Sequence, residues 1–492
     1  MLRRVKETSE WDIIIIGGGA TGLGAAVDAA SRGYKTLLLE KFDFAKGTSS
    51  RSTKLVHGGV RYLAQGNIKL VMEALRERGY LLKNAPHLTS AKAFVVPVYS
   101  WFDKFFYGIG LKIYDVLSGK LSLGKTQWLN KSKTLQQLQG INAQKVKGGI
   151  LYYDGQFDDA RLAVELAATA VFHGAAVINY AEVTGILKEE NKIAGIQFTD
   201  TISQTTFTAK TNVIINATGV FTNDILQMDE PGEENIVAPS QGIHLVVDKK
   251  FFPSPNAMMI PKTSDGRVLF AVPWHDKVVI GTTDTALEKI SFEPEPLQQE
   301  IEFVLHHANL YLQENITRAD VTSMFAGLRP LVKKKGAKKT SVLSRDHIIM
   351  VSKSNLVTIT GGKWTTYRKM AEDAIDNAVF VAKLPKKECV TKFLAIGNHK
   401  NAYVQNSGDA FIHHSFKCTA KDIEWFIKNE MAQTVEDILA RRTRLLFLDA
   451  KAAIDTALPV AKIMAAILNK NNDWINNQVE TFSKTAAQYC LQ

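Results

Sequence analysis

Apolar residues near the N-terminus are grouped in a pattern that predicts a strand, a helix and a second strand. The run Ile13–Ile16 is entirely β-branched, as expected for a strand buried on both faces. A glycine cluster and an alanine-rich helical stretch follow it, and Lys35–Leu39 has the pattern of a second strand. Such a unit within residues 11–41 predicts a doubly wound α/β domain with a parallel sheet.

Strand patterns of the same kind recur far along the chain. Asn212–Gly219 (NVIINATG) and Leu356–Gly362 (LVTITGG) each combine a short apolar run with a following glycine. Because these pieces are expected to share one sheet, the first domain is predicted to be discontinuous. We place it at residues 10–95, 150–235 and 340–390.

The rest of the chain shows two other patterns. Between residues 236 and 339, strand-like runs such as HLVVD and KVVIGTTD alternate with turn residues, which predicts a mostly antiparallel second domain. From residue 395 to 492 the apolar spacing becomes helical and glycine is rare, so this tail is predicted to form a helical cap.

An amphipathic stretch, Val98–Leu117, lies within residues 96–149. Its aromatic residues and lysines are typical of a surface that faces lipid, and its charges argue against a membrane-spanning helix. Gly108 and Gly110 are expected to divide it into two turns of helix. The alternative is that its apolar stripe is buried in a core. Apolar positions recur at three- and four-residue steps, apart from the charged ones: Phe102, Phe105, Ile109, Ile113 and Val116, against Lys104, Lys112 and Asp115.

The composition excludes several classes of protein. Of 492 residues 46% are hydrophobic and 22% charged, which excludes a fibrous or disordered chain and predicts two or three domains. No apolar run is long enough to span a bilayer, and the N-terminal MLRRVKETSEWD lacks the apolar core of an export signal. Cys389, Cys418 and Cys490 are far apart and lack metal-ligand spacing, so a reducing compartment fits and no metal site is expected.

The net charge of +11 favours an anionic partner, which would be a nucleic acid, a membrane surface or a small substrate. The basic residues are spread along the chain, and no nucleic-acid-binding motif accompanies them. We therefore expect no nucleic-acid partner. The lysine run Lys333–Lys339 adds attraction to an anionic membrane surface.

A dinucleotide-binding turn follows the first strand. Gly17, Gly19 and Gly22 form the GxGxxG pattern, whose glycines permit a tight turn, close approach to a pyrophosphate and close helix packing. Glu40 ends the second strand, where it is expected to bind an adenosine ribose, and its charge disfavours the 2′-phosphate of NADP. The alternative is a glycine-rich turn of another α/β protein.

Three further segments favour FAD over NAD. Gly47–Lys54 (GTSSRSTK) is rich in hydroxyls and cations that suit a diphosphate, and Ala217–Gly219 ends a buried strand. Thr360–Arg368 (TGGKWTTYR) repeats the strand–glycine–helix pattern and offers a helix N-terminus to the flavin ring. The expected cofactor-binding residues are Gly17, Gly19, Ala20, Thr21, Gly22, Glu40, Lys41, Thr48, Ser49, Ser50, Arg51, Ser52, Lys54, Leu55, His57, Gly58, Gly59, Ala217, Thr218, Gly219, Gly361, Gly362, Lys363, Trp364 and Thr365.

Over nearly its whole length the sequence resembles the FAD-dependent, respiratory glycerol-3-phosphate dehydrogenases. The motifs that carry the resemblance are KLVHGGVRYL, FAGLRPL, SRDH, TGGKWTTYR and ARRTRLLF. The resemblance implies a glutathione-reductase-type, Rossmann-like FAD domain, an antiparallel-sheet substrate domain and a C-terminal helical cap. It further implies oxidation of sn-glycerol 3-phosphate to dihydroxyacetone phosphate, with electrons passed through FAD to a membrane quinone.

A dianionic phosphate requires several fixed cations, preferably arginines. Arg61, Arg329, Arg345 and Lys363 each lie in one of the family motifs beside a glycine or a turn. Tyr62 and Thr283 are candidate hydroxyl donors to the same substrate. The alternative for any one arginine is a structural salt bridge.

Oxidation of a secondary alcohol also requires a base or a cation that stabilises the developing alkoxide. His244 (QGIHLVVD) is favoured over His57 as the catalytic base, with Arg329 and Lys363 as electrostatic alternatives. His347 is expected to pack within its own turn.

Two other flavoenzyme functions are alternatives on the same scaffold. One is an oxidase that uses O₂, and the other is an amino-acid or hydroxy-acid dehydrogenase. We expect a cytoplasmic protein attached peripherally to the inner face of the cell membrane. The oligomeric state, including a homodimer, and the role of the cap are left open.

Overall fold

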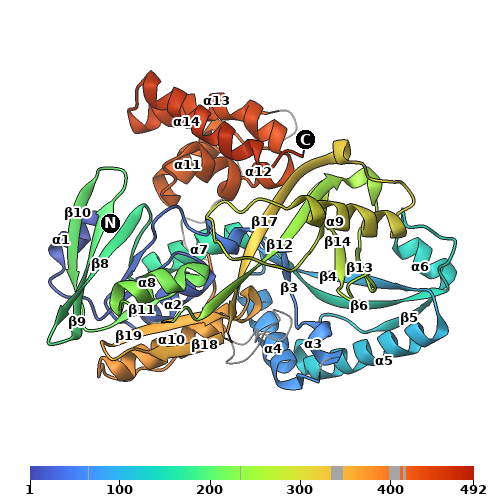
Figure 1. Ribbon diagram of the computed structural model, residues 1–492, viewed down its shortest axis with the longest axis horizontal. Helices are drawn as coiled ribbons and strands as arrows, with labels where there is room; N and C mark the ends of the chain where they lie inside the picture. Colours follow the sequence, from blue (N-terminus) through green and yellow to red (C-terminus); the bar gives the residue numbers. More distant parts are fainter. Residues whose placement is uncertain (65, 233, 334–346, 398–409, 414–416, 492) are drawn as a thin grey trace.

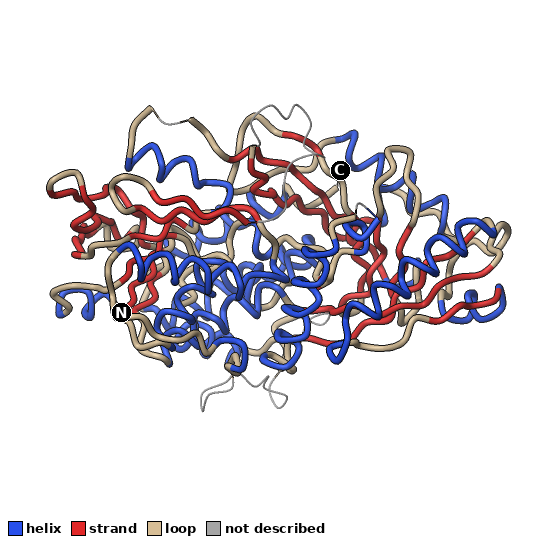
Figure 2. The backbone as a smooth tube through the Cα atoms, turned by 90° about the horizontal axis from the view of Figure 1, so that it is seen from below, coloured by secondary structure: helices blue, strands red, loops and turns tan. Residues whose placement is uncertain are grey.

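The computed structural model describes residues 1–492 except 65, 233, 334–346, 398–409, 414–416 and 492 (Figure 1). The molecule is elongated, and its two termini lie apart in both views (Figures 1 and 2). The largest parts of the fold are two sheets and a helical cap.

A six-stranded sheet has the order β18-β19-β11-β1-β2-β7, and β18 is its antiparallel edge. At its centre Ile14 lies between Ile214 and Leu37, and every side chain of β1 is buried. Helices α2 and α7 pack together, as do α2 and α10, and their alanine-rich faces share one core with the sheet. The predicted parallel sheet from distant segments is confirmed. Its elements are β1 (Ile13–Ile16), β2 (Thr36–Leu39), β7 (Ala176–Ile178), β11 (Ile214–Asn216), β18 (His347–Val351), β19 (Leu356–Gly361), α2 (Ala20–Ser31), α7 (Asp159–Phe172) and α10 (Tyr367–Val381).

A ten-stranded, largely antiparallel sheet has the order β16-β12-β15-β14-β13-β4-β6-β3, with β17 paired to β12 and β5 to β6. Helices α6 (Lys131–Gln137) and α9 (Gln298–Tyr311) contact it. Its strands are β3 (Leu55–Val56), β4 (Thr89–Val98), β5 (Gln127–Asn130), β6 (Gly148–Phe157), β12 (Val237–Asp248), β13 (Ala257–Ile260), β14 (Leu269–Trp274), β15 (Lys277–Gly281), β16 (Thr285–Ala286) and β17 (Val321–Val332).

This sheet draws on more of the chain than the expected residues 236–339. Strand β3 and most of β4 and β6 come from segments assigned to the first domain, yet they pair in the second sheet. The reason is a long antiparallel ladder between β4 and β6, which runs from Thr89–Phe157 to Val98–Gly148. Pairing between strands fifty residues apart leaves no local pattern, so the sequence did not reveal it.

A smaller three-stranded sheet, β10-β9-β8, was not expected. It forms an antiparallel excursion between β7 and β11, near helices α1 (Leu2–Glu7) and α8 (Thr222–Asp229) at one end of the molecule (Figure 1). Its strands are β8 (Ala181–Glu189), β9 (Lys192–Asp200) and β10 (Thr205–Lys210).

The predicted helical cap is confirmed in the described part of the C-terminal region. A π-helical turn, Asp437–Arg442, places two buried arginines against Asp43, which follows β2. Arg442 donates to both Asp43 oxygens at 2.6 and 2.9 Å, and Arg441 donates at 2.5 Å. Burial raises the pKa of Asp43, but Arg442 and Arg441 outweigh it and hold this pKa below its ordinary value. The cap helices are α11 (Ala420–Glu430), α12 (Leu445–Leu448), α13 (Ala450–Leu468) and α14 (Asn472–Ala487).

Helix α5 (Trp101–Ser118) runs unbroken through both glycines, so the predicted division is wrong. Gly108 is needed for packing instead, because any side chain there would overlap the ring of Trp128. The predicted apolar stripe lies exposed, whereas Leu111 and Tyr114 on the other face are buried. Two shorter helices, α3 (Val60–Ala64) and α4 (Ile68–Asn84), pack against α5. Among the described residues, none of the helices combines the length and apolar character that crossing a bilayer requires.

Candidate active site

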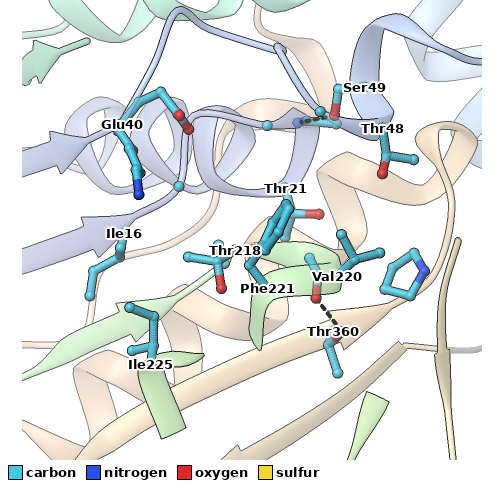
Figure 3. Close-up of a pocket in the computed structure, with 18 of the residues that line it drawn as sticks. Ile16, Thr21, Glu40, Thr48, Ser49, Thr218, Val220, Phe221, Ile225 and Thr360 are labelled. Carbon is cyan, nitrogen blue, oxygen red and sulfur yellow. Dashed lines mark hydrogen bonds between the residues drawn. The ribbon is translucent and has the colours of Figure 1, made fainter. Parts of the chain in front are cut away.

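A cavity of about 350 Å³ lies at the ends of β1, β2, β11 and β19 (Figure 3). Its floor is the glycine turn that enters α2. Gly17 has a φ of 111°, and a Cβ at this position would lie 2.7 Å from the Ala217 carbonyl oxygen. A Cβ at Gly22 would overlap the Gly17 carbonyl. Only glycine therefore permits this close approach, which leaves room for a pyrophosphate at the N-terminus of α2.

Glu40 holds the glycine turn in place. Its carboxylate accepts hydrogen bonds from the backbone N–H of Gly18 at 2.6 Å and of Phe42 at 2.9 Å. Burial raises its pKa in spite of these two bonds. Glu40 lines the cavity at the expected position, and its contact with a ribose stays a prediction.

The 47–54 segment joins three parts of the cavity wall. Ser49 Oγ accepts from the Ala20 N–H at the start of α2 at 2.9 Å (Figure 3). The indole of Trp364 donates to the Ser49 carbonyl at 2.8 Å, and Thr48 donates to the Leu328 carbonyl at 2.6 Å. These bonds bring together segments that lie more than 250 residues apart in sequence.

Most of the predicted cofactor-binding residues line this cavity. They are Gly17, Gly19, Ala20, Thr21, Glu40, Lys41, Thr48, Ser49, Ala217, Thr218, Gly219, Gly361, Gly362, Lys363 and Trp364. Others in the prediction do not line it, namely Gly22, Ser50, Arg51, Ser52, Lys54, Leu55, His57, Gly58, Gly59 and Thr365.

Lys54 and Arg51 correct the prediction most clearly. Lys54 is fully buried and pairs with Asp159 at 2.8 Å, while its ammonium lies 5.0 Å from the ring centroid of Trp274. Arg51, 4% exposed, donates to Glu293 at 2.7 Å. Both cations are therefore neutralised inside the protein, because an unpaired buried charge would be too costly.

Three aromatic residues that sequence reasoning missed also line the cavity. Phe42 follows β2, Phe221 belongs to the turn after β11, and Phe292 comes from the segment before α9. The sequence offered a signal for Phe42 and Phe221, because each follows a strand whose carboxyl end is expected to face the cofactor site. Nothing in the local sequence marks Phe292.

Of the predicted substrate residues, Tyr62 and Lys363 come together. The Lys363 ammonium lies 5.2 Å from the Tyr62 ring centroid, and both lie beside Gly59. The backbone of His57 is fixed close by, because its N–H and carbonyl both bond the Thr365 hydroxyl at 3.2 Å. Arg61 lies in α3, but its side chain is outside the described residues, as is Arg345. Lys334–Lys339 also lies outside them.

Arg329 lies on β17 and reaches across to β12 and to the segment that follows β15. Its terminal nitrogens donate to Thr282 Oγ at 3.1 Å and to Asp284 at 3.3 Å. The guanidinium is thus held rigidly and remains partly exposed. Thr283, in contrast, is buried and donates to Glu300 at 2.7 Å, so its hydroxyl supports the sheet.

His244 lies on β12, 3% exposed and stacked on Phe325 at 4.9 Å. Its Nε2 is 2.8 Å from the Thr53 hydroxyl, and Nδ1 has no hydrogen-bond partner among the described residues. Burial, and then the charges of Lys54 and Arg329, hold the pKa of His244 well below its ordinary value. The imidazole is therefore neutral near pH 7. His347, expected to pack within its turn, instead meets Asp373 of α10 at 3.0 Å.

Two family profiles match the chain. Residues 12–368 match the profile described as FAD dependent oxidoreductase. Residues 390–474 match the profile described as the C-terminal domain of alpha-glycerophosphate oxidase. Together these two profiles cover both large sheets and most of the cap.

Named relatives match over nearly the whole chain. The mitochondrial glycerol-3-phosphate dehydrogenase of Mesocricetus auratus is 37% identical, over 99% of this chain and 74% of its own length. The Homo sapiens protein of the same name is 37% identical, over 98% of this chain and 74% of its own. A solved structure of Bacillus halodurans glycerol-3-phosphate dehydrogenase, complexed with FAD, superposes with a TM-score of 0.80 at 27% identity, covering 99% and 97% of the two chains.

Proposed function

The chain belongs to the FAD-dependent oxidoreductases, in the family of glycerol-3-phosphate dehydrogenases, and from this membership we propose a quinone-linked enzyme. Its reaction is the oxidation of sn-glycerol 3-phosphate to dihydroxyacetone phosphate. FAD, when bound, accepts the hydride that leaves the alcohol carbon. The residues of this chain bind and orient the substrate and take the hydroxyl proton.

The cavity supports FAD as the cofactor through its backbone. Gly17 and Gly22 leave no space for a side chain, and the N-terminus of α2 offers N–H donors to a diphosphate. Gly361 and Gly362, both with positive φ, end β19 beside the same cavity. These features would hold the diphosphate and the flavin at the two ends of one continuous pocket.

His244 is our proposed base. The buried Nδ1, which has no hydrogen-bond partner among the described residues, would take the hydroxyl proton, with Nε2 carrying its hydrogen toward the Thr53 hydroxyl. A neutral imidazole in a dry site is competent for this step, and Arg329 and Lys363 would stabilise the developing alkoxide. His57 is the alternative base, next to the Tyr62 and Lys363 pair.

The phosphate is proposed to bind among Arg61, Arg329, Arg345 and Lys363, with Tyr62 beside them. The supporting observation is that Lys363 lines the FAD cavity while contacting Tyr62, so a cation and a hydroxyl lie at the edge of the cofactor site. Anaerobic addition of glycerol 3-phosphate should bleach the flavin absorbance, and glycerol without phosphate should not. An equal response to both alcohols would contradict phosphate recognition.

The electron acceptor is proposed to be a membrane quinone. The alternative is O₂, because the C-terminal profile is described as a domain of an oxidase. Stopped-flow reoxidation of the reduced enzyme separates the two acceptors. Rapid reaction with a ubiquinone analogue and slow reaction with air support the dehydrogenase, and the reverse order supports the oxidase.

A quinone stays in the bilayer, so an enzyme that reduces it must reach the membrane. Helix α5 is the proposed contact, and the inner face of the cell membrane is the proposed side of attachment. Phe102 is 77% exposed and Val116 73%, which is unusual for large apolar residues on one helix. Exposed lysines, among them Lys112 and Lys120, lie on or next to the same helix.

Flotation with anionic liposomes tests this contact. The wild type should float, less so at high salt, and the double variant Phe102→Glu/Phe105→Glu should stay with the soluble fraction. Phe172→Glu, at an exposed phenylalanine on α7, is the matched control. If the double variant floats as well as the wild type, α5 is not the membrane contact.

A further inference from the structure

Residues 287–297, here called the strap, join β16 to α9 and contribute Phe292 to the wall of the FAD cavity. The ring of Phe292 stacks on Phe221 with centroids 3.9 Å apart and meets the edge of Phe42 at 4.6 Å. Phe42 follows β2 and Phe221 follows β11, and these strands lie on opposite sides of β1. Phe292 therefore bridges the two walls of the pocket on either side of the glycine turn.

Glu293, the next residue, fastens the strap to the segment that carries the cofactor loop. Its carboxylate accepts from Arg51 at 2.7 Å and pairs with Lys46 at 3.0 Å. Arg51 also donates to the Phe292 carbonyl at 3.2 Å. Burial raises the pKa of Glu293, but Arg51 and Lys46 outweigh it and keep this pKa below its ordinary value, so the carboxylate stays ionised.

The same carboxylate also connects the strap to the cap. The hydroxyl of Tyr489, near the C-terminus, donates to Glu293 at 3.1 Å. Lys46 bonds both Glu293 and Glu436 of the cap, the latter at 2.7 Å. At its other end the strap is held to β12, because Gln241 donates to the Glu295 carbonyl at 2.9 Å. The strap is thus anchored at the sheet and latched at Glu293.

We propose that the strap is the retaining gate of the FAD pocket, and that Glu293 is its latch. When the latch opens, Phe292 separates from Phe221 and Phe42, and the two walls part enough for FAD to enter or leave. When the latch closes, the cap holds it shut through Tyr489 and Lys46. The inference requires only the FAD cofactor and not the substrate or quinone of the proposed function.

Glu293 makes this gate testable, because it does not itself line the cavity. Glu293→Gln should weaken the latch without changing the pocket wall, so FAD association to the apoprotein and FAD dissociation should both accelerate, by about tenfold. Rates are followed by the change in FAD fluorescence. Glu295→Gln, in the same strap, is the matched control, because Glu295 is exposed and its carbonyl is the group bonded to Gln241. The control should stay within about twofold of the wild type.

The outcomes separate a gate from a simple contact. Faster dissociation with unchanged or slower association in Glu293→Gln would overturn the gate, since the carboxylate would then only stabilise the bound state. Unchanged rates in both directions would overturn it too. A melting temperature with saturating FAD that stays well above the assay temperature excludes unfolding during the measurement, and hydrogen exchange at residues 287–297 should rise in Glu293→Gln and not in Glu295→Gln.

Tyr489→Phe tests the link to the cap, since it removes one hydroxyl from the latch. FAD dissociation should be faster than in the wild type and slower than in Glu293→Gln. A rate equal to that of the wild type would overturn the part of the proposal that assigns the cap to the latch. These measurements stand even if glycerol 3-phosphate proves not to be the substrate, because none of them involves turnover.

Discussion

The FAD cavity and the surroundings of His244 are built in different ways. The cavity is shaped by backbone: glycines at strand ends, the start of α2 and short hydrogen bonds that position turns. Around His244 the structure relies on side chains, with the fully buried Lys54–Asp159 pair and the rigidly held Arg329. A backbone site depends on local sequence, whereas a side-chain site depends on distant segments being brought together and on every buried charge finding a partner.

The cap, like the surroundings of His244, is held by side chains from distant segments. Arg441 and Arg442 meet Asp43 across roughly 400 residues of sequence, with all three side chains almost fully buried. Asp43 lies next to Phe42 and near Lys46, which line the cavity. Damage to the buried charges should therefore mainly destabilise the fold, whereas damage to the glycine turn should mainly weaken cofactor binding.

The largest expected effect follows Arg442→Met, which leaves Asp43 with one guanidinium and removes the donor to the Glu430 carbonyl. Breaking a buried pair from one side costs about 3–5 kcal/mol, so the urea midpoint should fall sharply. Lys484→Met, which breaks the exposed pair with Glu480, should leave the midpoint unchanged. A midpoint equal to the wild type for Arg442→Met would show that the cap is not held by its buried charges.

Arg329→Ala should lower kcat/KM for glycerol 3-phosphate while FAD stays bound. Loss of a charge-assisted contact in a dry site is worth about 2–4 kcal/mol, or roughly 10²–10³ in catalytic efficiency. Visible absorbance measures the bound flavin, and steady-state kinetics measure the efficiency. Arg318→Ala, at a surface arginine, serves as the control. An efficiency within about threefold of the wild type would make Arg329 structural, in keeping with its bond to Asp284.

Gly22→Ala should weaken FAD binding by about 10–100-fold, because relieving the overlap with the Gly17 carbonyl, at about 1–3 kcal/mol, moves the turn away from the position that a pyrophosphate needs. Gly110→Ala, on α5, is the matched control, since a Cβ there meets nothing within 4 Å and Gly110 does not line the cavity. Isothermal titration of the apoproteins with FAD gives both affinities. Equal affinities would mean that the turn accommodates a methyl group without any loss of FAD binding. The contrast between a cavity shaped by backbone and a site built from side chains would then be wrong.

The smallest effect concerns pH. Because the pKa of His244 is lowered, the acid limb of the flavin-reduction rate should lie below pH 6.5 in the wild type. Lys54→Met/Asp159→Asn removes the Lys54 charge without stranding its partner, so this pKa should rise and the limb should move to higher pH.

Anaerobic stopped-flow profiles measure the position of this acid limb, with Lys484→Met as the control for loss of a lysine. Loss of the limb in His244→Ala would identify its origin. A limb that stays in place in both His244→Ala and the double variant would transfer the base role to His57.

Helix α5 shows where local pattern was sufficient and where it was not. The apolar spacing in Val98–Leu117 identified the face that lies exposed, because helical periodicity alone determines which residues share a face. The same reasoning misjudged Gly108. Whether a glycine breaks a helix or admits a neighbour depends on what packs against it, and here that neighbour is Trp128 from β5.

The sequence by itself determined the βαβ unit, the glycine turn, the parallel sheet, the helical tail and the FAD-dependent family. These features depend on residues close together in the chain, or on motifs whose spacing reflects one chemistry. Only the tertiary structure decided that Lys54 and Arg51 turn inward, that β4 and β6 join the second sheet, and that Phe292 lines the pocket. In each case the partner lies a long way along the chain, and burial of a charge, a strand edge or an aromatic ring is favourable only once that partner is in place.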